Sequence, residues 1–371
     1  MDLGFLASAY AAPGPFATAY LDTTSAVEGA AARIAARWRA RREELSAAGA
    51  DDATLDAMGE AAGRDHGDGD GQVLVGCQGR LLLDVRLPAP PRRETTTFGP
   101  LPDVLPMIAQ LADVVPYVLV VADRAGADIT AYGEHGDPSE ERHVQGGTFD
   151  IRKVKPGDWA AKKYQQRAEN LWQTNAKQVA EQVAGLAAVV RARIIVAAGD
   201  VRALGYLRDS LPRPAREILH EVDEGGRAAG ASETSLAEHV RRLVDETAVR
   251  DTMAVVEEFE QERGQHDRAV EGLANTVAAL RRAQVQTVVV GDGLADDATL
   301  HVGTEPVQLA VDRQELLDLG ADSITTAPAA TAVLRAAVGT GADLVLVPGG
   351  QIVLADGVGA VLRYADAATP G

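Results

Sequence analysis

The middle of the sequence alternates short, β-branched apolar runs with long amphipathic stretches, and this alternation constrains the fold most strongly. Residues 117–133 are expected to form two strands joined by a turn at 124–126, and residues 194–199 a buried strand. Helices are expected over residues 160–190 and 200–211. Strands that alternate with helices build sheets with helices packed on their faces. The sequence therefore predicts an α/β fold for this part of the chain.

The flanking sequences predict two further domains. The first has a strand, a long helix, a hairpin and a short helix, expected at 16–23, 26–48, 72–87 and 107–115. The last has helices expected at 252–263, 269–283 and 331–340, strands near 286–293 and 306–311, and a closing hairpin of strands at 343–348 and 360–364. A polar loop is expected after the first two middle strands, and a strand at 217–223 and a separate helix at 232–246 complete the middle segment. We therefore expect a mixed α/β (α+β) protein of three domains, over residues 1–115, 116–246 and 247–371.

Composition limits the class of protein. The chain is 46% hydrophobic but only 4% aromatic, so its cores must be built from Ala, Val, Leu and Ile. No apolar run approaches the roughly 20 residues that span a bilayer, and no basic residues precede the apolar start as in a signal peptide. The single cysteine, Cys77, lies in an apolar run and makes neither an intrachain disulfide nor a zinc cluster. These features predict a cytoplasmic protein without membrane contact.

Charge is distributed unevenly along the chain. The formal net charge of −18 argues against a general attraction to nucleic-acid phosphates and against DNA binding. One segment, residues 152–167, nevertheless carries six cations against one acid, Asp158, and Trp159 lies within it. Cations neutralise phosphates, and flat rings stack on unpaired bases. We therefore predict an RNA-binding segment, with contacts from Arg152, Lys153, Lys155, Trp159, Lys162, Lys163 and Arg167.

Two ordinary structural explanations stay open at this stage. Tyr164 and Trp172 lie at helical spacing with apolar residues, so they could be core residues, and the lysines could form a solvated helix face. A second basic run, at residues 33–42, places three arginines on one face of the expected helix at intervals of four. This row could follow phosphates or be an ordinary exposed helix face. Its members are Arg33, Arg37 and Arg41.

The sequence lacks the common catalytic motifs. It contains no GxxxxGK[ST] phosphate loop, no GxGxxG at a strand–helix junction, no HExxH and no GxSxG. The tripeptide Gly349-Gly350-Gln351 follows a proline between two apolar runs, where a turn is expected. We therefore expect no catalytic residues, no cofactor and no metal site.

The closing sequence IVLADGVGAVLRY and the order of elements in the middle segment resemble the archaeo-eukaryotic release factors and Pelota. The sequence is most similar to the bacterial branch: actinobacterial release-factor-like proteins and Balon-type ribosome hibernation factors. Release factors carry GRGGQ in the middle loop, whereas residues 155–160 read KPGDWA here. The resemblance implies a three-domain, release factor/Pelota-like architecture with a C-terminal L7Ae-like α/β domain. It also implies binding to the ribosomal A site, with elongation factor Tu as a possible protein partner.

Three functions follow as hypotheses. The leading one is a non-catalytic, ribosome-binding factor of translation that acts in hibernation under stress or on stalled ribosomes. In the second, an altered loop still supports peptidyl-tRNA hydrolysis in ribosome rescue. In the third, the chain is an α/β module that binds a small ligand or a protein outside translation.

Overall fold

The computed structural model describes residues 3–25, 28–64, 69–112, 114–123, 125–133, 138–145, 158–222, 233–265, 267–291, 293–295 and 297–366, with the backbone alone at 138, 158–168 and 233. Contacts divide the chain into two compact units. One contains residues 1–112 and 250–371, and the other contains residues 113–249. Within the described part of the chain, no helix combines the length and the apolarity that crossing a bilayer requires. The division into three domains stays a prediction.

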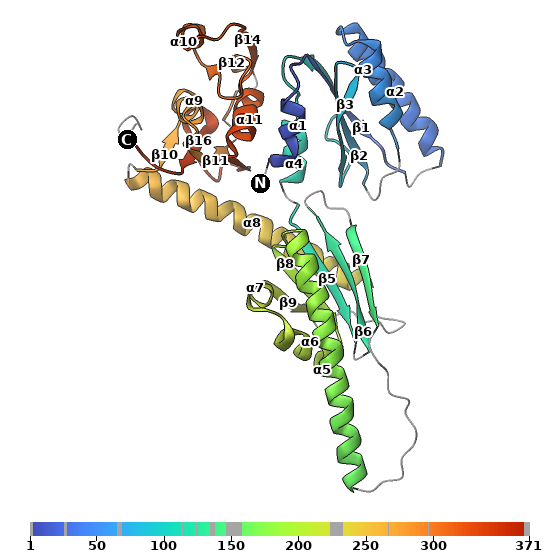
Figure 1. The fold of residues 1–371 in the computed structure, drawn as a ribbon. Coiled ribbons are helices and arrows are strands. Elements are labelled where there is room, and N and C mark those ends of the chain that lie inside the picture. Colours follow the sequence, from blue (N-terminus) through green and yellow to red (C-terminus); the bar gives the residue numbers. More distant parts are fainter. Residues whose placement is uncertain are drawn as a thin grey trace. The chain divides into compact units, whose positions relative to one another are not determined.

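The amino-terminal part of the first unit contains a four-stranded antiparallel sheet (Figure 1). Its order is β3-β2-β1-β4, and the strands are β1 (Phe16–Asp22), β2 (Gly71–Cys77), β3 (Arg80–Leu87) and β4 (Thr96–Gly99). The strand predicted at 16–23 and the hairpin predicted at 72–87 are confirmed. Two short helical segments, η1 (Gly4–Leu6) and α1 (Ala7–Tyr10), precede the sheet, and α4 (Leu105–Leu111) follows it.

Two helices pack against this sheet, and the sequence predicted only the first, α2 (Ala30–Ala47). The second, α3 (Asp52–Ala61), begins where the Asp51 side chain accepts a hydrogen bond of 2.9 Å from the Thr54 amide. Gln72, fully buried in β2, accepts from the Gly63 amide and donates to the Ala61 carbonyl. These bonds attach the end of α3 to the sheet and satisfy polar groups that burial would otherwise leave unpaired.

The second unit is built on a mixed five-stranded sheet of order β7-β6-β5-β8-β9. The central strands β5 and β8 are parallel, β9 continues the parallel part, and β6 and β7 are antiparallel additions. The α/β prediction is confirmed for this part of the chain. The polar loop predicted after the second strand was wrong in part, because β7 lies there as an edge strand. The strands are β5 (Tyr117–Ala122), β6 (Gly126–Tyr132), β7 (Pro138–Gln145), β8 (Ile194–Gly199) and β9 (Leu219–Val222).

Helices cover both faces of this sheet. On one face, the long helix α5 (Asp158–Val189) packs together with α6 (Val201–Ser210) over the apolar side of β5, β6 and β8. On the other face, the first part of α8 (Glu233–Gln265) packs through Leu236 and Val240. A short helix, α7 (Arg213–Glu217), precedes β9.

Helix α8 is one continuous helix of 33 residues, so the prediction of separate helices at 232–246 and 252–263 was wrong. Residues 247–251 read TAVRD and contain neither glycine nor proline. Nothing in that stretch ends a helix, because only those two residue types interrupt helices strongly. The division between the two compact units falls inside α8, between residues 249 and 250.

The carboxyl-terminal part of the first unit contains two sheets. The larger has the order β10-β16-β11-β15, with β15 parallel to β11 and β16 antiparallel to it. The predicted closing hairpin was therefore wrong, because β16 inserts between β10 and β11 instead of pairing with β15. The strands of this larger sheet are β10 (Ala269–Glu271), β11 (Val285–Val290), β15 (Asp343–Leu346) and β16 (Val358–Leu362). The helical segments in this part of the chain are α9 (Leu273–Arg281), α11 (Ala329–Thr340) and η2 (Ala355–Gly357).

The smaller sheet has the order β13-β12-β14 and was only partly predicted. A strand was expected near 306–311, and β13 is found there, whereas the other two strands and the short helix were not expected. These elements are β12 (Thr299–Val302), β13 (Leu309–Ala310), α10 (Arg313–Asp318) and β14 (Thr325–Pro328).

The arginine in the closing sequence VLRY has a structural role. The Arg363 guanidinium donates to the Ala283 carbonyl just after α9, at 2.9 Å. It also donates to the Thr340 and Gly341 carbonyls at the end of α11, at 3.1 and 2.7 Å. Helix carboxyl termini leave carbonyls without intrahelical partners and favour positive charge. Arg363 thus joins two helix ends next to the last strand.

Candidate nucleic-acid interface

The predicted RNA-binding segment lies wholly outside the residues whose side chains the structure describes. Arg152, Lys153 and Lys155 fall in an undescribed stretch, whereas four further predicted residues lie on the described backbone of α5. These four are Trp159, Lys162, Lys163 and Arg167. Figure 1 shows that the amino-terminal part of α5 continues beyond the strands of its unit.

The described side chains of α5 show where this helix joins the core. Its fully packed core residues are Val179, Ala180, Val183, Leu186 and Ala187, all in the carboxyl-terminal half. The predicted RNA-binding residues of α5 precede the first of these core residues, Val179, by about three turns or more. The predicted RNA contacts of residues 152–167 stay a prediction.

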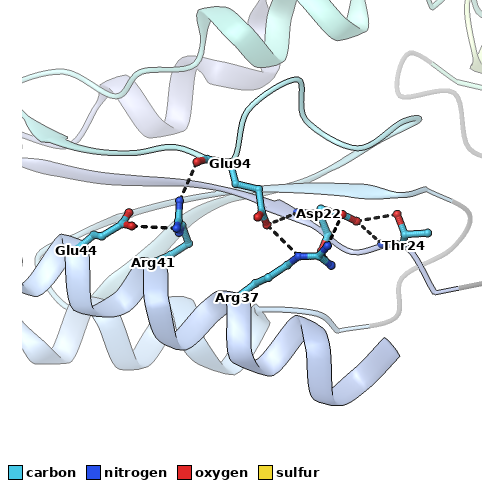
Figure 2. Close-up of polar contacts among 6 residues, drawn as sticks. All are labelled: Asp22, Thr24, Arg37, Arg41, Glu44 and Glu94. Atoms are coloured by element: carbon cyan, nitrogen blue, oxygen red, sulfur yellow. Dashed lines mark hydrogen bonds and ion pairs between the residues drawn. The ribbon is translucent and has the colours of Figure 1, made fainter. Parts of the chain in front are cut away.

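The arginine row on α2 is engaged with carboxylates of its own chain (Figure 2). The Arg37 guanidinium lies 2.6 Å from an Asp22 carboxylate oxygen and 3.4 Å from one of Glu94. The Arg41 guanidinium lies 2.9 Å from a Glu44 carboxylate oxygen and donates to the Glu94 carbonyl at 2.8 Å. Only about a quarter of the Arg37 side chain and a fifth of the Arg41 side chain are exposed.

These pairs change what the arginine row offers to RNA. A phosphate that approached Arg37 or Arg41 would compete with carboxylates already in contact, and it would meet their repulsion. Arg33, in contrast, is exposed. RNA contact by Arg33, Arg37 and Arg41 stays a prediction, and the structure gives Arg37 and Arg41 a clear role in attaching α2 to β1 and to Glu94.

The Asp22 carboxylate is the centre of this network. Burial acts to raise its pKa, but hydrogen bonds from the Thr24 hydroxyl and amide and the charge of Arg37 outweigh burial and lower it below the usual value. A carboxyl group whose pKa is lowered by folding stabilises the folded state above its unfolded pKa of about 3.9. That contribution is lost as the pH falls through the folded pKa.

We expect Asp22→Asn to lower the free energy of unfolding by about 1 kcal/mol at pH 7, because the substitution leaves the partly buried Arg37 with the more distant Glu94. The difference from the wild type should stay constant from pH 7 to about 5 and shrink below about pH 4, where Asp22 itself becomes protonated. Urea unfolding at a series of pH values measures it. A difference that is unchanged at low pH would contradict the assigned ion pair.

The carboxyl ends of the parallel strands β5 and β8 form another edge where ligands often bind in α/β sheets. Asp123 and Asp200 follow these strands directly. Asp123 accepts hydrogen bonds from the Ala125 and Gly126 amides, and Asp200 accepts from the first amides of α6. Among the described residues, no three His, Cys, Asp or Glu side chains are grouped so that they could hold a metal ion. The two aspartates therefore serve the local backbone.

A polar groove of about 550 Å³ lies at the lateral edge of the same sheet, between the edge strand β7 and α5. Sequence reasoning missed it because residues 138–145 read PSEERHVQ, which lacks the apolar alternation of a typical strand. The signal that could have revealed it is the run of glutamine and glutamate on α5, at positions 178, 181 and 182. Those positions share one helix face.

One protein family matches most of the second unit and the remainder of α8. Residues 116–265 match the family described as bacterial archaeo-eukaryotic release factor family 2. This stretch of the chain is therefore similar to a bacterial release-factor domain. It comprises the elements from β5 to the end of α8, including the edge strand β7 and the projecting helix α5.

Two relatives align with nearly the whole chain. Two proteins of Mycobacterium tuberculosis, named uncharacterized protein Rv2629 in strain H37Rv and MT2704 in strain CDC 1551, are each 29% identical over 365 residues. Each alignment covers 96% of this chain and 95% of the relative. The relatives therefore align with residues 116–265 together with the sequences on either side.

Solved structures with similar folds come from translation factors. The crystal structure of the archaeal translation termination factor aRF1 is 15% identical, with 96% of this chain and 95% of that chain covered and a TM-score of 0.27. Dom34 of S. cerevisiae, titled a translation termination-like factor, is 11% identical, with coverages of 72% and 68% and a TM-score of 0.40.

Proposed function

We propose that this chain is a ribosome-associated translation factor that occupies the A site through the basic segment at residues 152–167 and does not hydrolyse peptidyl-tRNA. The observation that carries the proposal is the match of residues 116–265 to a release-factor family, with that basic segment inside the matched domain. An acidic chain of net charge −18 needs such a local cluster of cations to bind RNA. Hibernating or stalled ribosomes are the proposed targets, and elongation factor Tu is the proposed protein partner.

The chemistry of the loop sequence supports the proposed absence of hydrolysis. Hydrolysis at the peptidyl-transferase centre needs a backbone that places a water molecule and stabilises an oxyanion. Residues 155–160 read KPGDWA, where Pro156 restricts the backbone and Trp159 adds bulk. The tripeptide Gly349-Gly350-Gln351 lies outside the matched domain, in an exposed stretch after β15. We propose that the loop occludes the site.

Co-sedimentation with 70S ribosomes over a range of salt concentrations tests the binding. We expect Lys162→Glu/Lys163→Glu to weaken binding at least tenfold. If both lysines contact phosphates, the slope of log affinity against log salt should become shallower by about 1.4 to 1.8. Helix propensity changes little between lysine and glutamate, so α5 itself should persist.

The matched control is Arg241→Glu/Arg242→Glu, which reverses two neighbouring exposed cations on α8 and changes net charge by the same amount. It should retain wild-type affinity within about twofold. Equal losses in the two variants would show that only total charge matters. A wild-type protein that never sediments with ribosomes would refute the proposal.

The second candidate function, peptide release, is tested with programmed ribosomes that carry labelled peptidyl-tRNA. We expect no release above the background for the wild type. Release that disappears in Gln351→Ala would refute the non-catalytic proposal, because it would assign the chemistry to the tripeptide after β15.

A further inference from the structure

The groove between β7 and α5 has walls of two different kinds. Four consecutive residues of β7, at positions 142–145, line one side, so the strand edge itself forms that wall. Gln178, Glu181 and Gln182 of α5 line the other side, at spacings of three and four residues that place them on one helix face. A backbone edge thus faces a row of two side-chain amides and a carboxylate.

A groove with a strand edge as its wall suits an extended peptide. β7 is the last strand in its sheet and, in the described part of the chain, pairs only with β6. Such an edge presents backbone N–H and C=O groups that an added strand can use. The Gln178 amide can donate to and accept from a peptide bond, and Gln182, whose oxygen accepts from Arg142, can still donate through its NH₂ group. Four residues of an added strand would span ~13 Å.

The charges around the groove select the kind of peptide. Glu141 on β7 and Glu181 on α5 are both exposed. The guanidinium of Arg142 is held by the Glu140 carboxylate at 2.6 Å and by the Gln182 side-chain oxygen. The Arg142–Glu140 pair is neutral overall, so the exposed carboxylates of Glu181 in the groove and of Glu141 on the edge strand leave this edge acidic. This balance favours lysine and arginine side chains and disfavours phosphates.

Charged residues on an edge strand also prevent unspecific pairing between sheets. On β7 the same carboxylates would both discourage pairing with acidic or neutral strands and attract a basic strand. We propose that the groove between β7 and α5 binds an extended, lysine- or arginine-rich segment of a partner protein by strand addition to β7. This interaction is independent of the RNA contacts proposed for residues 152–167.

Fluorescence anisotropy with the full-length protein and a labelled peptide of four Lys-Val repeats tests the proposal. We expect saturable binding that Glu141→Lys/Glu181→Lys weakens at least tenfold. Hydrogen exchange of the amides at residues 142–145 should slow when the peptide is added, because strand addition protects the edge. Asp245→Lys/Glu246→Lys, which reverses two exposed acids of α8, is the matched control and should leave affinity within about twofold.

A peptide of the same sequence in which every backbone amide is N-methylated should bind at least tenfold more weakly, because neither of its edges can donate to the ladder of backbone hydrogen bonds. Equal binding of the methylated peptide would overturn strand addition. Equal losses in the two charge-reversed variants would show unspecific attraction. Absence of binding at about 1 mM peptide, or displacement of the peptide by a poly-U oligonucleotide from residues 142–145, would also overturn the proposal.

Discussion

Gly357→Ala is expected to lower the free energy of unfolding by about 3 kcal/mol or more. Gly357 has φ = +68°, and an added Cβ would lie 1.9 Å from the Leu294 amide nitrogen. That atom is backbone and belongs to a segment packed beside the start of β16, so it cannot rotate away as a side chain could. Either the closing strand or the loop at residue 294 must move, and both movements disturb the larger sheet of the carboxyl-terminal part.

Gly350→Ala is the matched control for this prediction. Its φ is +72°, nearly the same as that of Gly357, but nothing lies within 4 Å of the position an added Cβ would take. It should therefore cost only the left-handed backbone conformation, about 1 to 2 kcal/mol. Denaturant unfolding of both variants measures the difference. Equal losses would mean that the close approach at Leu294 contributes nothing.

Phe259→Ala is expected to cost about 3 to 5 kcal/mol, the usual range when a fully buried aromatic ring is removed. The Phe259 side chain is completely buried on α8, and an added Cβ at Gly359 would lie 2.9 Å from its ring. The Arg263 guanidinium lies 5.5 Å from the ring centroid on the same helix. The ring belongs to a core cluster with Val256, Ala269, Val289, Val347, Ile352, Leu354 and Val361.

Two further substitutions on α8 would distinguish the loss of the Phe259 ring from a general weakening of the helix. Glu257→Ala changes an exposed residue of the same helix and should shift stability by no more than about 0.5 kcal/mol. Phe259→Leu keeps most of the apolar volume and should cost clearly less than alanine. Similar unfolding midpoints for Phe259→Ala and the wild type would contradict the packing of α8 against β16.

Two glycines in the closing sequence now have separate physical reasons. Gly357 allows the backbone to pass close to Leu294, and Gly359 leaves room for the Phe259 ring. Arg363, four residues after Gly359, donates to carbonyls at two helix ends. The closing sequence that resembles the release factors is therefore explained by the packing of the carboxyl-terminal sheet. It does not by itself describe contact with RNA.

The elements predicted most securely from sequence were those with a strong local pattern. β5 and β8 are continuous apolar runs, and such runs form buried parallel strands wherever helices cover both faces. α5 was predicted because its apolar positions repeat at helical spacing. The charged strand β7 was not predicted, because an edge strand needs little apolar surface and its sequence therefore shows no alternation of apolar and polar residues.

The sequence alone determined the α/β character of the middle segment, the hairpin β2–β3 and the concentration of cations at residues 152–167, because each depends on residues close together in the chain. Only the tertiary structure decided that β16 lies between β10 and β11, and that Asp22 and Glu94 neutralise Arg37 from 15 and 57 positions away. Local periodicity shows which side chains face a core. It does not show which distant strand or carboxylate meets them there, because that depends on how the packed elements share space.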